Sequence, residues 1–231
     1  MLTCIEHETS PNPLASVIWM HGLGADGSDF AGIVPQLNLR HCPPIRFVFP
    51  NAPSMPVTVN NGYVMPAWYD IYGSNLVQKQ DATGITRSAQ AICELIEQEV
   101  KRGIPYENIA LAGFSQGCAM ALHTGLLFPK ELAGIIALSG YLPLADQFKS
   151  QRQLTNQNTP IFLAHGIYDP VVVPERAEES RKLLVELGYQ VHWKTYPMEH
   201  SVHPQELIDI AEFFNQIFQT NLKQLCRQFL A

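Results

Sequence analysis

Short apolar runs recur along the chain, and most of them are continuous rather than alternating. Strands that are buried on both faces read this way, whereas half-exposed strands alternate between apolar and polar residues. The pattern therefore predicts a mostly parallel sheet buried inside the molecule. Its predicted strands are Ser16–Met20, Ile45–Phe49, Ile109–Gly113, Gly134–Leu138, Ile161–Ala164 and Val191–Tyr196.

Helical periodicity fills several of the gaps between these runs. One apolar stripe ends at Gly103 and steps by three or four residues through Ile85, Ala89, Ile92, Ile96 and Val100. A second helix is predicted over Pro174–Leu187, since proline suits a first helical turn and Gly188 follows its end. Further helices are predicted over Cys118–Leu127 and from about Pro204, where the inward residues are Leu207, Ile208, Ala211, Phe214 and Ile217.

Strands that alternate with helices imply right-handed crossovers and helices on both faces of the sheet. We expect one α/β domain over residues 1–231, with a core at about 14–218 and a C-terminal helical extension over 219–231. In the extension, Leu222, Leu225 and Phe229 are spaced like one helix face, which favours packing onto the domain over binding a membrane or a partner. The stretch 50–84 fits neither template, and its length predicts a wall or lid of a functional site.

Composition excludes several classes of protein. The 231 residues are 46% hydrophobic and 16% charged, and the net charge of −6 disfavours nucleic acid as a partner. No apolar run reaches the roughly 18 residues of a transmembrane helix, and the first residues are acidic, unlike a secretory signal. The five cysteines lack any C-x-x-C pair, so neither a disulfide framework nor a zinc site is indicated. We therefore expect a cytoplasmic protein.

The sequence Gly113-Phe114-Ser115-Gln116-Gly117 has the G-x-S-x-G form. Five-residue matches of this kind occur by chance, but this one lies between a predicted strand and a predicted helix. A strand-to-helix turn with glycine on both sides exposes a serine hydroxyl for attack on a carbonyl carbon. Ser115 is therefore the candidate nucleophile.

A serine nucleophile needs a base and a group that orients the base, and both follow Ser115 in the chain. Asp169 comes just after the predicted strand Ile161–Ala164, and His200 just after Val191–Tyr196. Alone, an aspartate before proline is most often a turn former, and a single histidine is most often structural. The order Ser, Asp, His at three strand ends is the order of the α/β-hydrolase triad, and it predicts that fold.

Two other histidines lie near the candidate triad. His203 competes with His200 as the base, but it precedes Pro204 and is placed like the entry to the last helix. His200 is preferred because it lies nearer the strand end. His165 lies in the turn that leads to Asp169, where we expect it to form hydrogen bonds within the loop.

Acyl transfer also needs donors for the oxyanion. His21-Gly-Leu-Gly24 follows the first predicted strand, as the glycine-rich loops of esterases do. It places the backbone N–H of Leu23 as a candidate donor beside the N–H of Gln116. A phosphate-binding loop is the alternative for such a sequence, but the G-x-x-x-x-G-K-[ST] motif is absent.

Several segments together resemble the acyl-protein thioesterase and carboxylesterase family, also described as lysophospholipases. The resemblance spans about residues 14–218 and agrees with the assignments of Ser115, Asp169, His200, Leu23 and Gln116. The segments are HGLGADGSDF (21–30), RFVFPNAP (46–53), PVTVNNGYVMPAWYDI (56–71), GFSQG (113–117), LSGYLP (138–143), HGIYDP (165–170) and YPMEHSV (196–202).

The resemblance also implies which residues contact the substrate. The loop that contains Trp68 would border the acyl site, and Val171 and Val172 would line it. From the residues alone, Trp68 could equally be a core aromatic. The family usually has a second glycine where this chain has Cys118, and a thiol there could narrow the helix start or make the protein sensitive to oxidation.

The sequence thus predicts a serine hydrolase that cleaves carboxylic esters or thioesters through an acyl-enzyme. No metal or organic cofactor is implied. The substrate is expected to be an acylated small molecule, lipid or protein, and lysophospholipase activity is the alternative. A non-catalytic protein that keeps the hydrolase scaffold to bind a ligand is a further alternative. The resemblance suggests monomers or weak homodimers.

Overall fold

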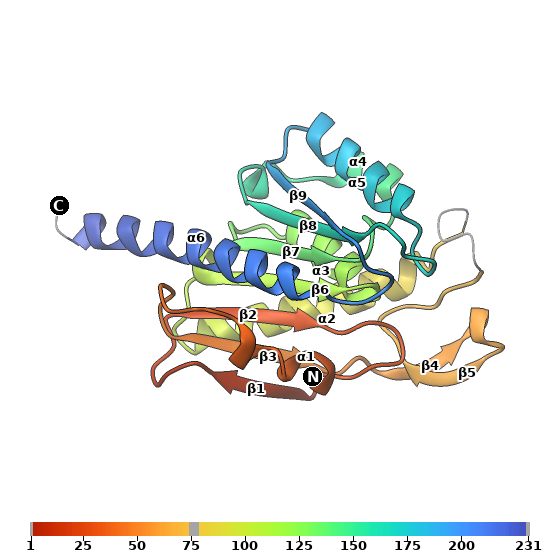
Figure 1. The fold of residues 1–231 in the computed structure, drawn as a ribbon, viewed down its shortest axis with the longest axis horizontal. Helices are drawn as coiled ribbons and strands as arrows, with labels where there is room; N and C mark the ends of the chain where they lie inside the picture. The colour runs from red at the N-terminus through yellow and green to blue at the C-terminus, as the bar shows by residue number, and fades with distance from the viewer. Residues whose placement is uncertain (1, 74–78, 230–231) are drawn as a thin grey trace.

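A seven-stranded sheet forms the middle layer of the molecule (Figure 1). The computed structural model describes residues 2–73 and 79–229. Within these residues β1 pairs antiparallel with β3, and every pair from β3 to β9 is parallel, which confirms the predicted α/β-hydrolase sheet. The spatial order is β1 (Cys4–Glu8), β3 (Ile45–Pro50), β2 (Ala15–Met20), β6 (Ile109–Phe114), β7 (Gly134–Leu138), β8 (Ile161–Gly166) and β9 (Val191–Tyr196).

The two faces of the sheet bury two separate hydrophobic cores. Ile18 and Met20 of β2 face the first core, and Val17 and Trp19 face the second, because successive side chains of a strand point to opposite faces. Both sets are buried, which is why the run shows no alternation. The helices that contribute to the first core are α2 (Ala82–Lys101), α3 (Gln116–Leu127), α4 (Ala145–Gln151) and α5 (Pro174–Glu186), and those of the second are α1 (Ser28–Ala31) and α6 (Pro204–Phe229).

Local signals fix the ends of the longer helices. The Asp81 carboxylate accepts a hydrogen bond of 2.9 Å from the Gly84 N–H and so caps the start of α2. Gly103 and Gly188 follow α2 and α5 with φ of +96° and +86°, a conformation that glycine adopts without strain. Short 3-10 turns lie at Val34–Gln36, Thr58–Asn60, Tyr106–Asn108 and Leu154–Asn156.

Two parts of the sheet structure were not expected from the sequence. Strand β1 lies at the edge of the sheet, and most of its residues are exposed. Its residue Glu8 forms an ion pair of 3.0 Å with Arg46 of β3. Residues 4–8 therefore extend the sheet before the core expected from about residue 14. The stretch 50–84 holds a hairpin of β4 (Ser54–Val57) and β5 (Tyr63–Pro66), which projects beyond the main sheet in Figure 1.

The carboxyl ends of the parallel strands lie at one edge of the sheet, and loops leave this edge from β2, β6, β8 and β9. At the opposite end, α6 continues to Phe229, and its last turns extend past the sheet in Figure 1. The side chains expected to pack this tail onto the domain lie outside the described residues. Of the described helices, none has the length and apolar character needed to cross a membrane.

Candidate active site

Ser115 lies in a sharp turn between β6 and α3. Its backbone has φ 56° and ψ −115°, a conformation that a residue with a side chain adopts only when its surroundings impose it. A Cβ atom at Gly113 would overlap the carbonyl group of Gly117, and one at Gly117 would overlap that of Met20. The Ser115 N–H donates a hydrogen bond of 2.8 Å to the Leu138 carbonyl. The two glycines thus allow the close packing that holds the serine in this conformation.

Ser115, His200 and Asp169 form one chain of hydrogen bonds. Nε2 of His200 lies 2.8 Å from Oγ of Ser115, and Nδ1 lies 2.7 Å from Oδ2 of Asp169. Because an ionised carboxylate only accepts, Nδ1 carries the proton and the free pair on Nε2 faces the serine hydroxyl. Phe114 packs against the imidazole with ring centroids 4.8 Å apart. The ring is therefore oriented for removing the hydroxyl proton of Ser115.

The Asp169 carboxylate is buried and held by donors on both oxygens. Oδ1 accepts hydrogen bonds from the N–H groups of Val171 and Val172, at 2.8 and 2.9 Å. Oδ2 accepts from His200 and also lies 3.4 Å from Nε2 of His165. Burial alone would raise the pKa of Asp169, but the donors from His165, His200 and Val172 outweigh it and hold the pKa well below its usual value. The carboxylate is therefore ionised wherever His200 can act as a base.

His165 links Asp169 to the loop that follows it. Its Nε2 lies 2.8 Å from the Val172 carbonyl oxygen, and since a carbonyl only accepts, Nε2 is the protonated nitrogen. The side chain is fully buried, and its Nδ1 has no partner among the described residues. These contacts agree with the loop-structuring role expected from the sequence.

The glycine-rich loop after β2 packs directly on the nucleophile turn. A Cβ atom at Gly22 would lie 3.4 Å from Cβ of Ser115, and Gly24 has φ +76°. The Gly24 N–H donates to the Pro66 carbonyl at 2.8 Å, which ties this loop to β5. In the described loops and turns, the backbone N–H groups of Leu23 and Gln116 donate to no carbonyl oxygen. Both candidate oxyanion donors thus lie in segments next to Ser115, and neither N–H group is used by a backbone acceptor of these segments.

His21 fixes the start of this loop. Its Nε2 accepts a hydrogen bond of 3.0 Å from the Ala52 N–H, and its Nδ1 lies 2.7 Å from the Gly22 carbonyl oxygen. These partners require the proton on Nδ1, and burial lowers the pKa of His21, so the ring is held neutral. The ring therefore acts as a structural bridge between the loops after β2 and β3.

The side chain of Gln116 clamps the loop that contains Trp68, a role that the sequence did not indicate. Its Oε1 accepts from the Trp68 N–H at 2.8 Å, and its Nε2 donates to the Tyr69 carbonyl at 2.7 Å. The Trp68 indole N–H in turn donates to the His21 carbonyl at 2.9 Å. The signal available in the sequence was a glutamine at the first position of a helix that continues with only small or apolar residues over 117–122.

The residues expected to contact substrate differ in exposure. Trp68 is fully buried and contacts His21 at the start of the glycine-rich loop, which favours a supporting role over direct contact with substrate. Val172 is buried as well, whereas Val171 is 61% exposed at the edge of the site. The resemblance implied substrate contact for all three residues, but only Val171 is exposed to solvent.

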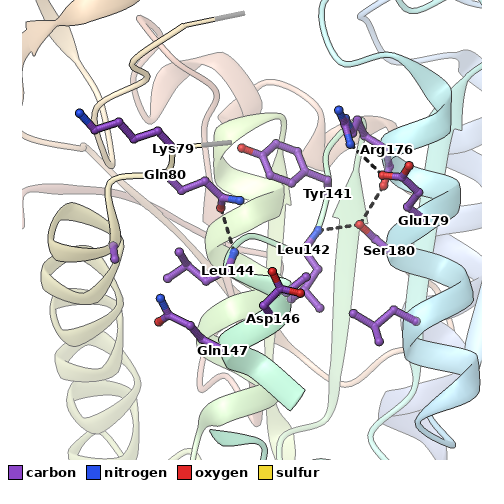
Figure 2. Close-up of a pocket in the computed structure, with 13 residues that line it drawn as sticks. Lys79, Gln80, Tyr141, Leu142, Leu144, Asp146, Gln147, Arg176, Glu179 and Ser180 are labelled. Carbon is purple, nitrogen blue, oxygen red and sulfur yellow. Dashed lines mark hydrogen bonds and ion pairs between the residues drawn. The ribbon is translucent and has the colours of Figure 1, made fainter. Parts of the chain in front are cut away.

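A pocket of about 490 Å³ lies between α5, the start of α2 and the connection from β7 to α4 (Figure 2), and none of Ser115, His200 and Asp169 lines it. Tyr141 forms one wall, and it follows Gly140, where a Cβ atom would overlap Sγ of Cys118. Lys79 and Arg176 lie on opposite sides of the pocket in Figure 2, and its lining also includes leucines and the acidic residues Asp146 and Glu179. The lining thus combines leucine side chains with side chains of both charges.

No group of three or more His, Cys, Asp or Glu side chains in residues 2–73 and 79–229 is arranged to hold a metal ion. The side chains that the structure brings together at the candidate site are those of Ser115, His200 and Asp169.

Comparison with known proteins places this geometry in a family. A family model described as Phospholipase/Carboxylesterase matches residues 4–218. The chain belongs to this family. Acyl-protein thioesterase 1 of Schizosaccharomyces pombe is 43% identical over 190 residues, which cover 82% of this chain and 83% of the relative. Acyl-protein thioesterase 1 of Neurospora crassa is 43% identical over 211 residues, covering 87% and 86%.

Solved structures of similar proteins share the fold. The crystal structure of Arabidopsis thaliana SOBER1 has a TM-score of 0.83 at 31% identity and covers 88% of this chain and 98% of that protein. The crystal structure of Zea mays acyl-protein thioesterase 2 has a TM-score of 0.78 at 27% identity, with coverage of 93% and 99%. These likenesses confirm the α/β-hydrolase fold and the resemblance seen in the sequence.

Cys118 stands where the family usually has a second glycine. The thiol is fully buried, and burial raises its pKa well above the usual value. A thiol that is neither exposed nor ionised reacts poorly with oxidants. The structure thus gives Cys118 a packing role against Gly140 and does not favour the sensitivity to oxidation considered from the sequence.

Proposed function

We propose that this member of the phospholipase/carboxylesterase family hydrolyses carboxylic esters or thioesters with Ser115 as nucleophile. The observation that supports this most directly is the chain of hydrogen bonds of 2.8 and 2.7 Å from Ser115 through His200 to Asp169. A buried, ionised carboxylate, a correctly protonated imidazole and a strained serine turn are the three components of this chemistry.

In the proposed reaction, Oγ of Ser115 attacks the carbonyl carbon while its proton moves to Nε2 of His200. Asp169 stabilises the imidazolium that results. The negative charge that develops on the carbonyl oxygen is held by the N–H groups of Leu23 and Gln116, and loss of one such donor typically costs about 3 kcal/mol. His200 then protonates the leaving alcohol or thiol, and the acyl group stays on Ser115.

The second half-reaction repeats these steps with water. His200 removes a proton from water, and the hydroxide oxygen attacks the acyl carbon. The bond to Oγ of Ser115 breaks, and His200 returns the proton to Oγ. The carboxylic acid leaves, and the enzyme returns to its starting protonation state.

The names of the relatives favour acylated proteins or acylated lipids as the substrate class. Because the N–H groups of Val171 and Val172 hold the Asp169 carboxylate, these two residues are proposed to border the acyl group, with the Trp68 loop as the opposite wall. Lysophospholipase activity shares the same machinery and differs only in the group that leaves. We further propose a monomer or weak homodimer in the cytosol, where unpaired cysteines such as Cys4 and Cys93 persist.

Hydrolysis of p-nitrophenyl esters and matched acyl thioesters of increasing chain length tests the proposal. Wild type should turn over at least one series, and Ser115→Ala should not. Ser150→Ala, which changes an exposed serine on α4, is the matched control and should match wild type. If Ser115→Ala kept the wild-type rate, or if wild type acted on neither series, the proposal would be rejected and ligand binding without catalysis would take its place.

A further inference from the structure

Glu206 is a fully buried carboxyl group in the first turn of α6. One oxygen, Oε2, accepts a hydrogen bond of 3.2 Å from the His203 N–H. The other oxygen, Oε1, has no hydrogen-bond partner among the described residues. Buried polar atoms without partners are rare in native proteins, and each calls for a reason. The reaction assigned to the triad makes no use of this group.

His203 and Glu206 form a reciprocal cap on α6. While Glu206 accepts from the His203 N–H, Nδ1 of His203 accepts a hydrogen bond of 3.1 Å from the Gln205 N–H. Pro204 occupies the first helical position between them. The arrangement is a capping box in which an imidazole nitrogen takes the place usually filled by a serine or threonine hydroxyl. It fixes the point where the chain enters α6.

The same cap anchors the loop that carries His200. This loop, residues 197–203, joins β9 to α6, and His203 lies three positions after His200. The His203 ring stacks on Tyr196 at the end of β9, with centroids 5.8 Å apart and planes 14° apart. On the other side of His200, the Met198 carbonyl accepts from the Tyr168 N–H at 3.1 Å. The loop around His200 is therefore held between one anchor at Tyr168, just after β8, and another at the cap.

We propose that Glu206 is a positioning residue for His200: its carboxylate ties His203 to α6, and ionisation of that carboxylate tightens the loop that orients the imidazole toward Ser115. The inference rests on the proposed function, because it assigns His200 as the base. It makes the geometry of the triad depend on a carboxyl group outside the triad.

The electrostatic surroundings support ionisation in the neutral range. Burial raises the pKa of Glu206 to about 7, and the charge of Asp209 on the same helix adds to the increase. Tyr196 of β9 and His203 of the loop also face the carboxyl group. Asp209 is itself held by the Tyr196 hydroxyl at 2.6 Å and lies 3.6 Å from Nζ of Lys194. An ionised acceptor binds an N–H about twice as strongly as a neutral one, so the cap strengthens as pH rises through this range.

Kinetics across pH test the proposal through Glu206→Gln, which keeps the size and the neutral acceptor but cannot ionise. We expect kcat of wild type and variant to agree within error at about pH 5.5 and wild type to be about 5-fold faster at about pH 8.5, with KM unchanged. Glu212→Gln removes the same charge at an exposed position of α6 and should match wild type at both pH values. A ratio between wild type and Glu206→Gln that is the same at both pH values would overturn the proposal.

Hydrogen exchange gives a readout that needs no substrate. Backbone amides of residues 199–203, corrected for intrinsic rates, should become about 5-fold more protected in wild type between about pH 6 and pH 8 and show no such gain in Glu206→Gln. If wild type shows this difference in protection but hydrolyses no ester, the role of Glu206 in the cap is supported and the proposed function is rejected. Equal protection gains in both proteins would overturn the cap.

A second variant keeps the test decisive if Glu206→Gln does not fold. Asp209→Asn keeps the hydrogen-bonding shape and removes the neighbouring negative charge that opposes ionisation of Glu206. The gain in protection of residues 199–203 should then occur at lower pH than in wild type. An unchanged midpoint would overturn the proposal.

Discussion

Replacing Gln116 separates the two roles that this residue has in the site. Its backbone N–H is a proposed oxyanion donor and survives any substitution except proline, whereas its side chain clamps Trp68 and Tyr69. Gln116→Ala removes only the clamp. It leaves the Trp68 N–H and the Tyr69 carbonyl without partners in a buried place.

The size of the effect follows from these two groups. Leaving a buried donor or acceptor unpaired costs about 1–3 kcal/mol, so the variant should lose about 3 kcal/mol of unfolding free energy. In a chain of this size that corresponds to a fall in Tm of about 10 °C. Trp68 also supports the His21 carbonyl through its indole N–H. A loosened Trp68 should therefore misplace the oxyanion loop, and we expect kcat to fall about 10-fold.

Gln116→Glu is the matched variant because it keeps the acceptor for the Trp68 N–H and changes only the group that faces the Tyr69 carbonyl. Two acceptors then face each other unless the new carboxyl is protonated, so its folded pKa should lie above its unfolded value. The free energy of unfolding of Gln116→Glu should be greatest at and below about pH 4.3, the pKa of a glutamate in the unfolded chain. It should fall as pH rises through the pKa of the new carboxyl group in the folded protein.

Urea unfolding and kcat at about pH 5 and pH 8 measure these effects. Both variants should be less stable than wild type at the higher pH, and Gln116→Glu should recover at the lower pH while Gln116→Ala does not. If Gln116→Ala lost stability but kept the wild-type kcat at 25 °C, the link from the clamp to the oxyanion loop would be refuted. Equal stability of Gln116→Glu at both pH values would refute the pairing with the Tyr69 carbonyl.

Three further expectations concern groups outside the clamp. Asp169→Asn should lower kcat by about 10⁴-fold, because an amide N–H facing Nδ1 favours the wrong tautomer of His200; ester turnover of the folded variant checks this. Glu99→Ala should cost about 3 kcal/mol in urea unfolding and leave kcat unchanged, because it removes a buried partner that lies 2.9 Å from Arg46. Burial lowers the pKa of His123 to about 4, so the unfolded chain binds the proton first, and stability should fall between about pH 6.5 and pH 4 by up to roughly 1.4 kcal/mol per pH unit. His123→Leu should flatten that part of a urea-unfolding series, and an unchanged slope would contradict the assignment.

Buried strands and amphipathic helices were predictable from the sequence because their signals are local. Residues such as Ile85 and Ile96 mark the buried face of α2 by spacing alone, and both are fully buried. Strand β1 was not predictable, because an edge strand buries little surface. Its residues show no alternation of apolar and polar side chains that would distinguish it from a loop. The β4–β5 hairpin was missed for a similar reason, because its strands have only four residues each and bury little.

The sequence by itself determined which residues form the candidate triad: Ser115, Asp169 and His200 follow separate strands, and parallel strands bring their carboxyl ends to one edge. Only the tertiary structure decided how these groups are held. The clamp of Gln116 on Trp68, the link of His165 to Val172 and the cap of Glu206 on His203 join side chains to particular backbone atoms. Such contacts form only if the loops are placed to within a few tenths of an ångström of the hydrogen-bonding distance. Hydrophobic periodicity carries no information about this placement.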